Sequence, residues 1–185
     1  MLTKCSFAAV VFAFILAAQE LPIDTARSSI TIHAGKTGLF SAAGHDHFIA
    51  APISSGSIDP TALRVAFTVE SAKMTVKPDP KVDAKSQAGI QKDMEEMTLE
   101  TKKYPEIAFK STSIEKSGDE WRVAGSLSLH GVTKPIQLSV KRSGGAYTGR
   151  TVLKQTDFNI KPVSVAGGAV KVKNEIDIAF EIFTR

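Results

Sequence analysis

The polar cluster Gly44-His45-Asp46-His47 is the part of this chain whose residue types and spacing best suit chemistry. Two histidines one residue apart lie on the same face of an extended strand, where both imidazoles can bind a metal ion. The aspartate between them can orient an imidazole ring or bond to the local turn. A metal site needs three or four ligands, and His33 and His130 lack ligand-like spacing. Metal binding by His45 and His47 is therefore an alternative to a structural or surface role.

The rest of the sequence gives no pattern typical of an enzyme. It has no G-x-S-x-G turn, no H-E-x-x-H helix and no phosphate-binding glycine loop before a helix, and Cys5 is its only cysteine. The formal net charge is +4, with acidic and basic residues interspersed and no basic stripe with aromatic residues. We therefore expect no catalytic activity, no cofactor and no nucleic-acid partner.

Residues 1–19 have the three parts of a secretory signal peptide. One cation, Lys4, precedes the apolar stretch Phe7–Leu16, and the small residues Ala17-Ala18 follow it. The apolar stretch is shorter than the ~20 residues of a spanning helix, so a retained membrane anchor is the alternative interpretation. We expect cleavage near Ala18 or Gln19 and a periplasmic or secreted protein.

The elements that must position any site are short runs in which apolar and polar residues alternate. In the last run, Ile176, Ile178, Phe180 and Ile182 point one way and the residues between them the other, which is the period of two of a half-buried strand. The predicted strands are Ser29–Ala34, Ile53–Ile58, Leu63–Glu70, Glu106–Ile114, Trp121–His130, Ile136–Val140, Ala146–Gln155 and Ala169–Thr184. A glycine-rich bend leads through Phe40 to Ile49. No long helix alternates with the strands, so residues 20–185 predict one antiparallel domain with a closed sheet.

Turn and helix signals divide these runs. Ser117-Gly118-Asp119 and Gly144-Gly145 predict tight hairpins, and Gly131–Pro135 predicts a short connection. One stretch, Ala84–Leu99, reads as an amphipathic helix that Asp83 can cap, lying on or plugging the end of the barrel. Its apolar residues recur at helical spacing and predict packing rather than a ligand site: Ile90, Met94 and Met97.

Alternation alone does not decide whether the apolar side chains face an interior or lipid. Half of the predicted strands are shorter than the ~9–11 residues of a membrane strand, and one Trp and two Tyr are too few for two aromatic girdles. The pattern therefore favours a water-soluble barrel. An eight-stranded barrel either fills with its own side chains or holds one small guest, and both interpretations stay open.

Two motifs resemble the YceI family of polyisoprenoid-binding proteins. They are Lys103-Tyr104-Pro105-Glu106-Ile107-Ala108-Phe109-Lys110-Ser111 and Gly125-Ser126-Leu127-Ser128-Leu129-His130-Gly131-Val132-Thr133-Lys134-Pro135. The order of leader, early strands, one helix and later strands is also similar, over nearly all of the mature chain. One segment departs from the commoner family pattern of a histidine followed by apolar residues and Gly-x-Phe: Ala43-Gly44-His45-Asp46-His47-Phe48.

The resemblance implies an extended, eight-stranded, lipocalin-like antiparallel barrel whose apolar tunnel holds an isoprenoid lipid or quinone, for carriage, storage or sequestration in the cell envelope. Alternation nominates as tunnel residues Ile32, Phe40, Phe48, Phe67, Val69, Ile107, Phe109, Leu127, Leu129, Leu138, Phe158, Ile178 and Phe180. Transient contact with an envelope membrane and a homodimer stay open as further interactions. The alternatives are a metal-binding protein or metalloenzyme using His45 and His47, and a ligand-free interaction module of an envelope stress response.

Overall fold

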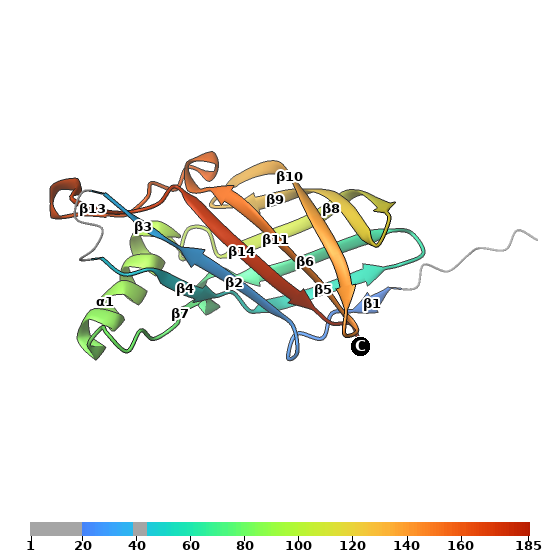
Figure 1. Ribbon diagram of the computed structural model, residues 1–185, viewed down its shortest axis with the longest axis horizontal. Coiled ribbons are helices and arrows are strands. Elements are labelled where there is room, and N and C mark those ends of the chain that lie inside the picture. The colour runs from blue at the N-terminus through green and yellow to red at the C-terminus, as the bar shows by residue number, and fades with distance from the viewer. Residues whose placement is uncertain (1–19, 39–43) are drawn as a thin grey trace, which may run out of the picture.

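The computed structural model describes residues 20–38 and 44–185, so the expected leader and the candidate Phe40 lie outside the described residues. Long strands run obliquely around a common axis, with α1 (Ala84–Asp93) at one end (Figure 1). The strands are β1 (Leu21–Pro22), β2 (Ser29–Ala34), β3 (Lys36–Thr37), β4 (His47–Ala50), β5 (Ile53–Asp59), β6 (Arg64–Glu70), β7 (Thr75–Val76), β8 (Glu106–Ser117), β9 (Glu120–Leu129), β10 (Val132–Ser143), β11 (Ala146–Lys154), β12 (Ser164–Val165), β13 (Val170–Val172) and β14 (Glu175–Ile182). The short helical turns are η2 (Ser71–Lys73), η3 (Met94–Thr98), η4 (Gln155–Phe158) and η5 (Ala166–Gly168).

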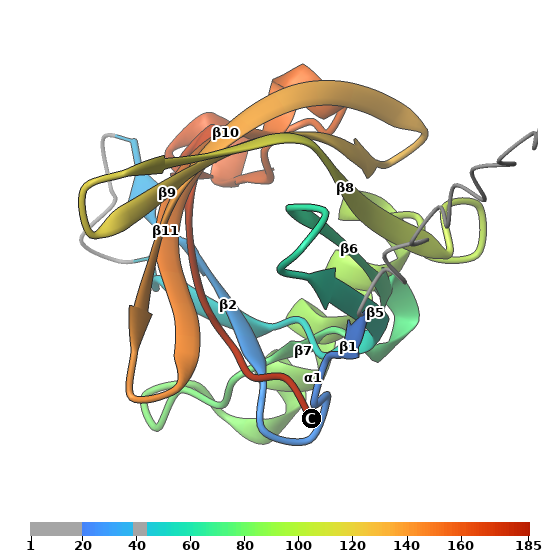
Figure 2. The same ribbon diagram turned by 90° about the vertical axis from the view of Figure 1, so that its right-hand side faces the viewer.

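Eleven of these strands form one antiparallel sheet in the order β1-β5-β6-β8-β9-β10-β11-β14-β2-β4-β7. The sheet curls strongly, as the view along its axis shows (Figure 2). The predicted class, all-β with one short helix in a barrel-like sheet, is confirmed, but the strand count of eight is wrong. Eight strands of this sheet have six or more residues, and the additional β1, β4 and β7 have two to four. Runs this short are not detectable by alternation. β8 and β10, with 12 residues each, are also longer than the predicted runs Glu106–Ile114 and Ile136–Val140.

The predicted strand Ala169–Thr184 is in fact two strands. β13 and β14 are separated by Lys173-Asn174, and β13 pairs with β12 and β3 in a separate three-stranded sheet. Asn174 fixes this break, because its carbonyl accepts from the Gln155 N–H and its Oδ1 accepts from the Thr156 N–H. We refer to residues 34–38 and 159–174, which contain these three strands, as the end sheet.

The hairpin predictions are confirmed at two of three positions. Ser117 ends β8 and Glu120 begins β9, and Gly144-Gly145 forms the two-residue turn between β10 and β11 with positive φ at both residues. The third turn is His130-Gly131 rather than Gly131–Pro135, with φ of 50° and 74°. Pro135 lies inside β10, opposite Ser126 of β9, on the part of β10 that precedes its pairing with β11. The missing N–H of proline is tolerated there because that side of the strand is an edge.

The predicted helix forms but changes its winding. Asp83 caps α1, accepting from the Ser86 N–H at 3.0 Å. From Met94 the chain continues as the π turn η3, in which the Leu99 N–H donates to the Met94 carbonyl. The wider turn rotates the following side chains, so that Met97 is 74% exposed and Leu99 is buried. The prediction that Met97 shares the packed face is therefore wrong.

Both edges of the curled sheet are covered. The backbone of Leu21–Asp24 bonds to β5 on one side and to the C-terminal residues on the other: Ile23 N–H donates to Gly56, Asp24 N–H to Phe183, and Arg185 N–H to Pro22. At the opposite edge, Gln91 of α1 accepts from the Val76 N–H of β7 and donates to the Met74 carbonyl. These contacts satisfy edge groups that could otherwise pair with another chain. No helix in the described residues is long and apolar enough to cross a membrane.

Candidate ligand-binding site

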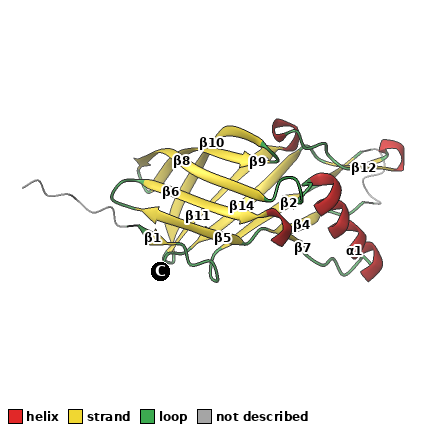
Figure 3. Cartoon of the chain, turned by 180° about the vertical axis from the view of Figure 1, so that it is seen from behind, coloured by secondary structure: helices red, strands yellow, loops and turns green. Residues whose placement is uncertain are grey.

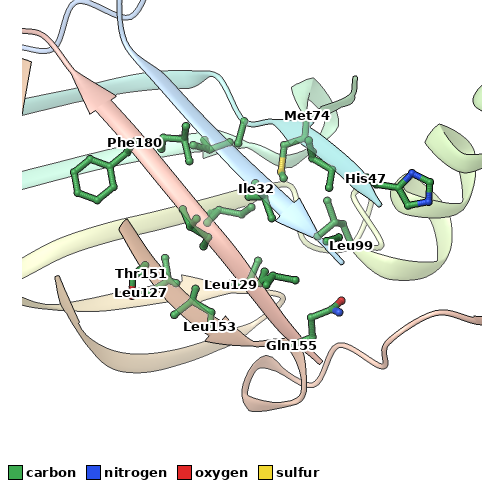
Figure 4. Close-up of a pocket in the computed structure, with 18 of the residues that line it drawn as sticks. Ile32, His47, Met74, Leu99, Leu127, Leu129, Thr151, Leu153, Gln155 and Phe180 are labelled. Carbon is green, nitrogen blue, oxygen red and sulfur yellow. The ribbon is translucent and has the colours of Figure 1, made fainter. Parts of the chain in front are cut away.

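A continuous cavity of about 870 Å³ lies inside the curled sheet. All eight long strands contribute lining side chains, mostly Ile, Val, Leu and Phe, and Figure 4 shows part of this wall. The volume is in the range of small-molecule binding sites. Its size distinguishes the molecule from a barrel whose interior is filled by its own side chains, because native cores leave few voids larger than a water molecule.

Ten of the thirteen tunnel candidates line this cavity. They are Ile32, Phe67, Val69, Ile107, Phe109, Leu127, Leu129, Leu138, Ile178 and Phe180. They come from β2, β6, β8, β9, β10 and β14, where alternation extends over several residues. Their role in ligand binding stays a prediction.

Two described candidates lie elsewhere. The Phe48 side chain is 48% exposed and stacks on the His33 ring with centroids 4.8 Å apart. Its neighbours His47 and Ile49 line the cavity, so in a strand Phe48 must point outward. Phe158 is 2% exposed and packs in the hydrophobic core, but it is not part of the cavity wall, because η4 turns the chain there.

Two glycines explain why large rings leave the interior open. Gly125 of β9 lies under the Phe109 ring, and a Cβ added to it would be 2.5 Å from Phe109 Cε2. Gly149 of β11 is the cross-strand partner of Phe180, and its added Cβ would be 2.9 Å from Phe180 Cε1. Each ring therefore occupies the space above a residue without a side chain. It lies against the wall instead of extending across the cavity.

Sequence reasoning missed several lining residues on short or irregular elements. Ile49 is on β4, Met74 and Val76 flank or form β7, Leu99 follows η3, and Gln155 begins η4. The alternation of Met74 with Val76 and of His47 with Ile49 was the available signal. It spans too few residues to outweigh the surrounding turn residues.

Polar groups concentrate at the end of the cavity between α1 and the end sheet, which we call the mouth. Its polar lining includes Lys36, His45, His47, Lys81, Asp83 and Lys171. The structure thus brings the two predicted histidines to the cavity, where His47 is labelled in Figure 4. Burial lowers the pKa of His47, with a further contribution from the neighbouring His45. The lowered pKa favours the neutral form of the His47 imidazole.

Histidine–carboxylate pairs hold the rim of the mouth. His45 Nδ1 lies 3.3 Å from Asp79 Oδ2. His33 lies between two carboxylates, 3.1 Å from Asp177 and 3.3 Å from Asp46. The Lys36 N–H donates to Asp46 at 2.9 Å and is the main reason that the pKa of Asp46 is lowered. These contacts join the segment 44–47 to β2, β14 and the loop before α1.

The fourth histidine fixes the chain that follows η3. His130 is 8% exposed, with Nε2 2.9 Å from Glu100 Oε2 and Nδ1 3.2 Å from the Phe158 carbonyl. Tyr104 packs on its ring with centroids 4.2 Å apart. The adjacent Gly131 is required because its added Cβ would be 2.6 Å from the Tyr104 ring. Within residues 20–38 and 44–185, no group of three His, Cys, Asp or Glu side chains is placed to hold a metal ion.

A strongly curled antiparallel sheet around a large apolar cavity defines the class: a barrel-like β protein with a binding-site-sized interior. The family model of the YceI-like domain matches residues 21–183. The chain therefore belongs to the YceI family, as the sequence motifs indicated.

Individual relatives match over shorter segments. The chain is 44% identical to Protein YceI of Escherichia coli O157:H7 over 75 residues, covering 34% of this chain and 38% of that protein. It is 38% identical to Protein YceI of Salmonella arizonae over 72 residues, with the same coverage. The matched segment thus spans well under half the length of these curated relatives.

Solved structures are similar in fold. Burkholderia cenocepacia BcnA superimposes with a TM-score of 0.62 at 19% identity, covering 86% of this chain and 98% of BcnA. A polyisoprenoid binding domain from Saccharophagus degradans, implicated in plant cell wall breakdown, gives a TM-score of 0.62 at 16% identity, covering 90% and 99%. At these identities the similarity concerns the fold alone.

Proposed function

We propose that this protein binds the hydrocarbon chain of an isoprenoid lipid, either a polyprenyl lipid or an isoprenoid quinone, inside the cavity. The observation that carries the proposal is a lumen of about 870 Å³ lined mostly by Ile, Val, Leu and Phe. Its function is then binding rather than catalysis. Family membership and the similarity to a polyisoprenoid binding domain support it.

The size of the cavity suits several isoprene units. At roughly 30 Å³ per non-hydrogen atom, the share of one water molecule in the liquid, about 870 Å³ corresponds to roughly 29 atoms, or about six five-carbon units. Each buried unit contributes roughly 3–4 kcal/mol of gross transfer free energy at about 0.8 kcal/mol per carbon, from which the cost of ordering the chain is subtracted. A few units therefore suffice without a specific polar contact along the wall.

The biological setting follows from the expected leader. Export of the chain would make it a periplasmic or secreted protein that carries, stores or sequesters the lipid in the cell envelope. The proposal also includes three more specific points: a quinone head group on the lipid, contact with an envelope membrane, and a homodimer. The large cavity favours lipid binding over a filled interaction module, because such a module needs no lumen.

Mass spectrometry of organic extracts tests the proposal directly. Protein purified from its native compartment should yield an isoprenoid lipid in constant proportion, and stripped protein should take up ubiquinone or polyprenyl phosphate. Protein that is always lipid-free and takes up neither would refute lipid binding.

A pair of tryptophan variants makes the test specific to the cavity. Ile178→Trp adds a large ring to the wall, whereas Val152→Trp adds the same ring to the outer face, where Val152 is 56% exposed. Excluding even part of one isoprene unit should reduce uptake at least about tenfold for Ile178→Trp, since about 1.4 kcal/mol corresponds to a factor of ten. Uptake by Val152→Trp should stay unchanged. Equal uptake by both variants would show that the lipid binds elsewhere.

A further inference from the structure

The end sheet differs in charge from the rest of the molecule. Residues 34–38 and 159–174 contain four lysines and neither aspartate nor glutamate. The lysines are Lys36, Lys161, Lys171 and Lys173. Three of them are exposed, and Lys36 is held in place because its Nζ donates to the Gly44 carbonyl at 2.8 Å. The residues of the end sheet thus carry only positive charges, and one carboxylate, Asp46, lies at their edge beside Lys36.

The end sheet projects beyond the long strands at the same end of the molecule as α1 (Figure 1, Figure 3). It forms one side of the mouth, since Lys36, Val163 and Lys171 line the cavity. Val163 is also 36% exposed, so an apolar side chain lies beside the lysines at the rim.

The opposite side of the mouth has a different character. Residues 77–96, which include α1, carry four lysines and five acidic residues. Their charges are largely balanced, and Asp79 and Asp83 already have partners in His45 and Ser86. The positive charge of the mouth is therefore concentrated on the end sheet, which directs this side toward an anionic surface.

We propose that the end sheet docks the protein on an anionic lipid bilayer with the mouth facing the membrane. Lysines near an anionic bilayer surface attract it over about a Debye length, and Val163 enters the interfacial region beside them. A lipid chain can then pass between bilayer and cavity without crossing water. The purpose of docking rests on the proposed function, but the docking itself is measurable with lipid-free protein.

Vesicle flotation with a charge-reversed variant tests the docking surface. The vesicles are phosphatidylcholine alone, or phosphatidylcholine with an equal share of phosphatidylglycerol. The variant is Lys161→Glu with Lys173→Glu, since neither side chain lines the cavity. The unmodified protein should bind only the anionic vesicles and dissociate as salt rises. The variant should bind at least roughly 30-fold more weakly, because each lysine near the surface contributes about a fivefold factor.

Lys110→Glu with Lys116→Glu is the matched control, because it changes the net charge equally on β8, away from the end sheet, at two exposed lysines. Its vesicle binding should stay within a fewfold of the unmodified protein. Equal losses of binding in the two variants, or equal binding to both vesicle types, would overturn the proposal. So would the absence of vesicle binding, including the case in which the protein binds an acidic polypeptide instead. Melting curves identify any misfolded variant, for which Lys161→Gln with Lys173→Gln is substituted. Lipid extraction from the same variants reports separately on the proposed function.

Discussion

The middle of the barrel and its mouth line the same cavity with different types of side chain. In the middle, regular strands present Ile, Val, Leu and Phe at every second position, and the inward side chains carry almost no polar atoms. At the mouth, short strands, a π turn and loops present lysines, histidines and carboxylates, joined by histidine–carboxylate contacts. The wall thus presents a nearly uniform apolar surface, whereas the mouth presents charged and hydrogen-bonding groups at one end of the cavity.

The largest expected effect is the loss of stability in Phe109→Ala, which removes a side chain from the cavity wall rather than from the outer surface. Phe109 is 3% exposed in the middle of the barrel, and buried Phe→Ala changes lower the free energy of unfolding by about 3–5 kcal/mol. Phe48→Ala removes the same ring from the outer face, where it is 48% exposed, and should cost under about 1 kcal/mol. Urea denaturation measures both. Similar losses would contradict the assignment of Phe48 to the outer face.

Gly149→Ala should have the next largest effect and act on stability and uptake together. The added Cβ would be 2.5 Å from the Ser139 carbonyl oxygen, so the wall must shift, at a cost of about 1–3 kcal/mol. The Phe180 ring is pushed into the cavity, and lipid uptake should fall. Gly89→Ala in α1 is the control, since nothing lies within 4 Å of its added Cβ. Alanine should stabilise that helix by up to about 1 kcal/mol. Unchanged uptake by Gly149→Ala would show that the ring position does not limit the lumen.

A change at the mouth, Asp83→Ala, should have a smaller and more local effect. It removes the cap of α1, whose two oxygens accept from the Ser86 N–H and hydroxyl, and weakens the helix by about 1 kcal/mol. Hydrogen exchange of the α1 amides should accelerate and bound lipid should leave faster, with little change in global unfolding. Asp83→Asn retains a capping oxygen and should restore slow exchange. If Asp83→Ala lowers global stability as much as Phe109→Ala, the mouth is not an independent region.

The smallest effect is the pH dependence of His47. Burial lowers its pKa in the folded protein below the ordinary 6.5, so the unfolded chain binds a proton more readily than the folded one. The free energy of unfolding should therefore decrease as pH falls from about 6.5 to the folded pKa, and level off below it. Comparison with His47→Gln isolates this contribution, and NMR titration gives the pKa. A His47 pKa above 6.5 would place the ring in a more polar environment than the structure does.

The inward-facing residues of regular strands were predictable because every second side chain along such a strand points to the same face of the sheet. Once Ile178 and Phe180 face inward, Ile176 and Ile182 must as well. The same rule gave Phe67 with Val69 and Leu127 with Leu129. This alternation is interrupted where a strand is irregular. The register of β8 shifts between Ser111 and Ser113, so that Ile107 and Phe109 share the inner face with Ile114. The residue types of this segment do not predict the bulge.

The mouth was less predictable because its geometry depends on contacts between distant segments. His33 meets Asp177 only after β2 pairs with β14, and His130 meets Glu100 only after the β9–β10 hairpin reaches the end of η3. The sequence presented His45 and His47 as a local pair, and both line the cavity. It did not identify their separate surroundings: Asp79 beside His45, and the cavity beside His47.

The joining of Leu21–Asp24 to residues 183–185 has a consequence for assembly. The nearby bond from the Phe183 N–H to the Ser28 hydroxyl joins residues 155 positions apart. Closure of the sheet therefore cannot finish until residues 183–185 have been synthesised. Contacts so distant in sequence also form slowly. The proposed lipid would therefore have two routes of entry: insertion before these bonds form, or passage beside α1 afterwards. Trapping experiments during refolding would reveal which one operates.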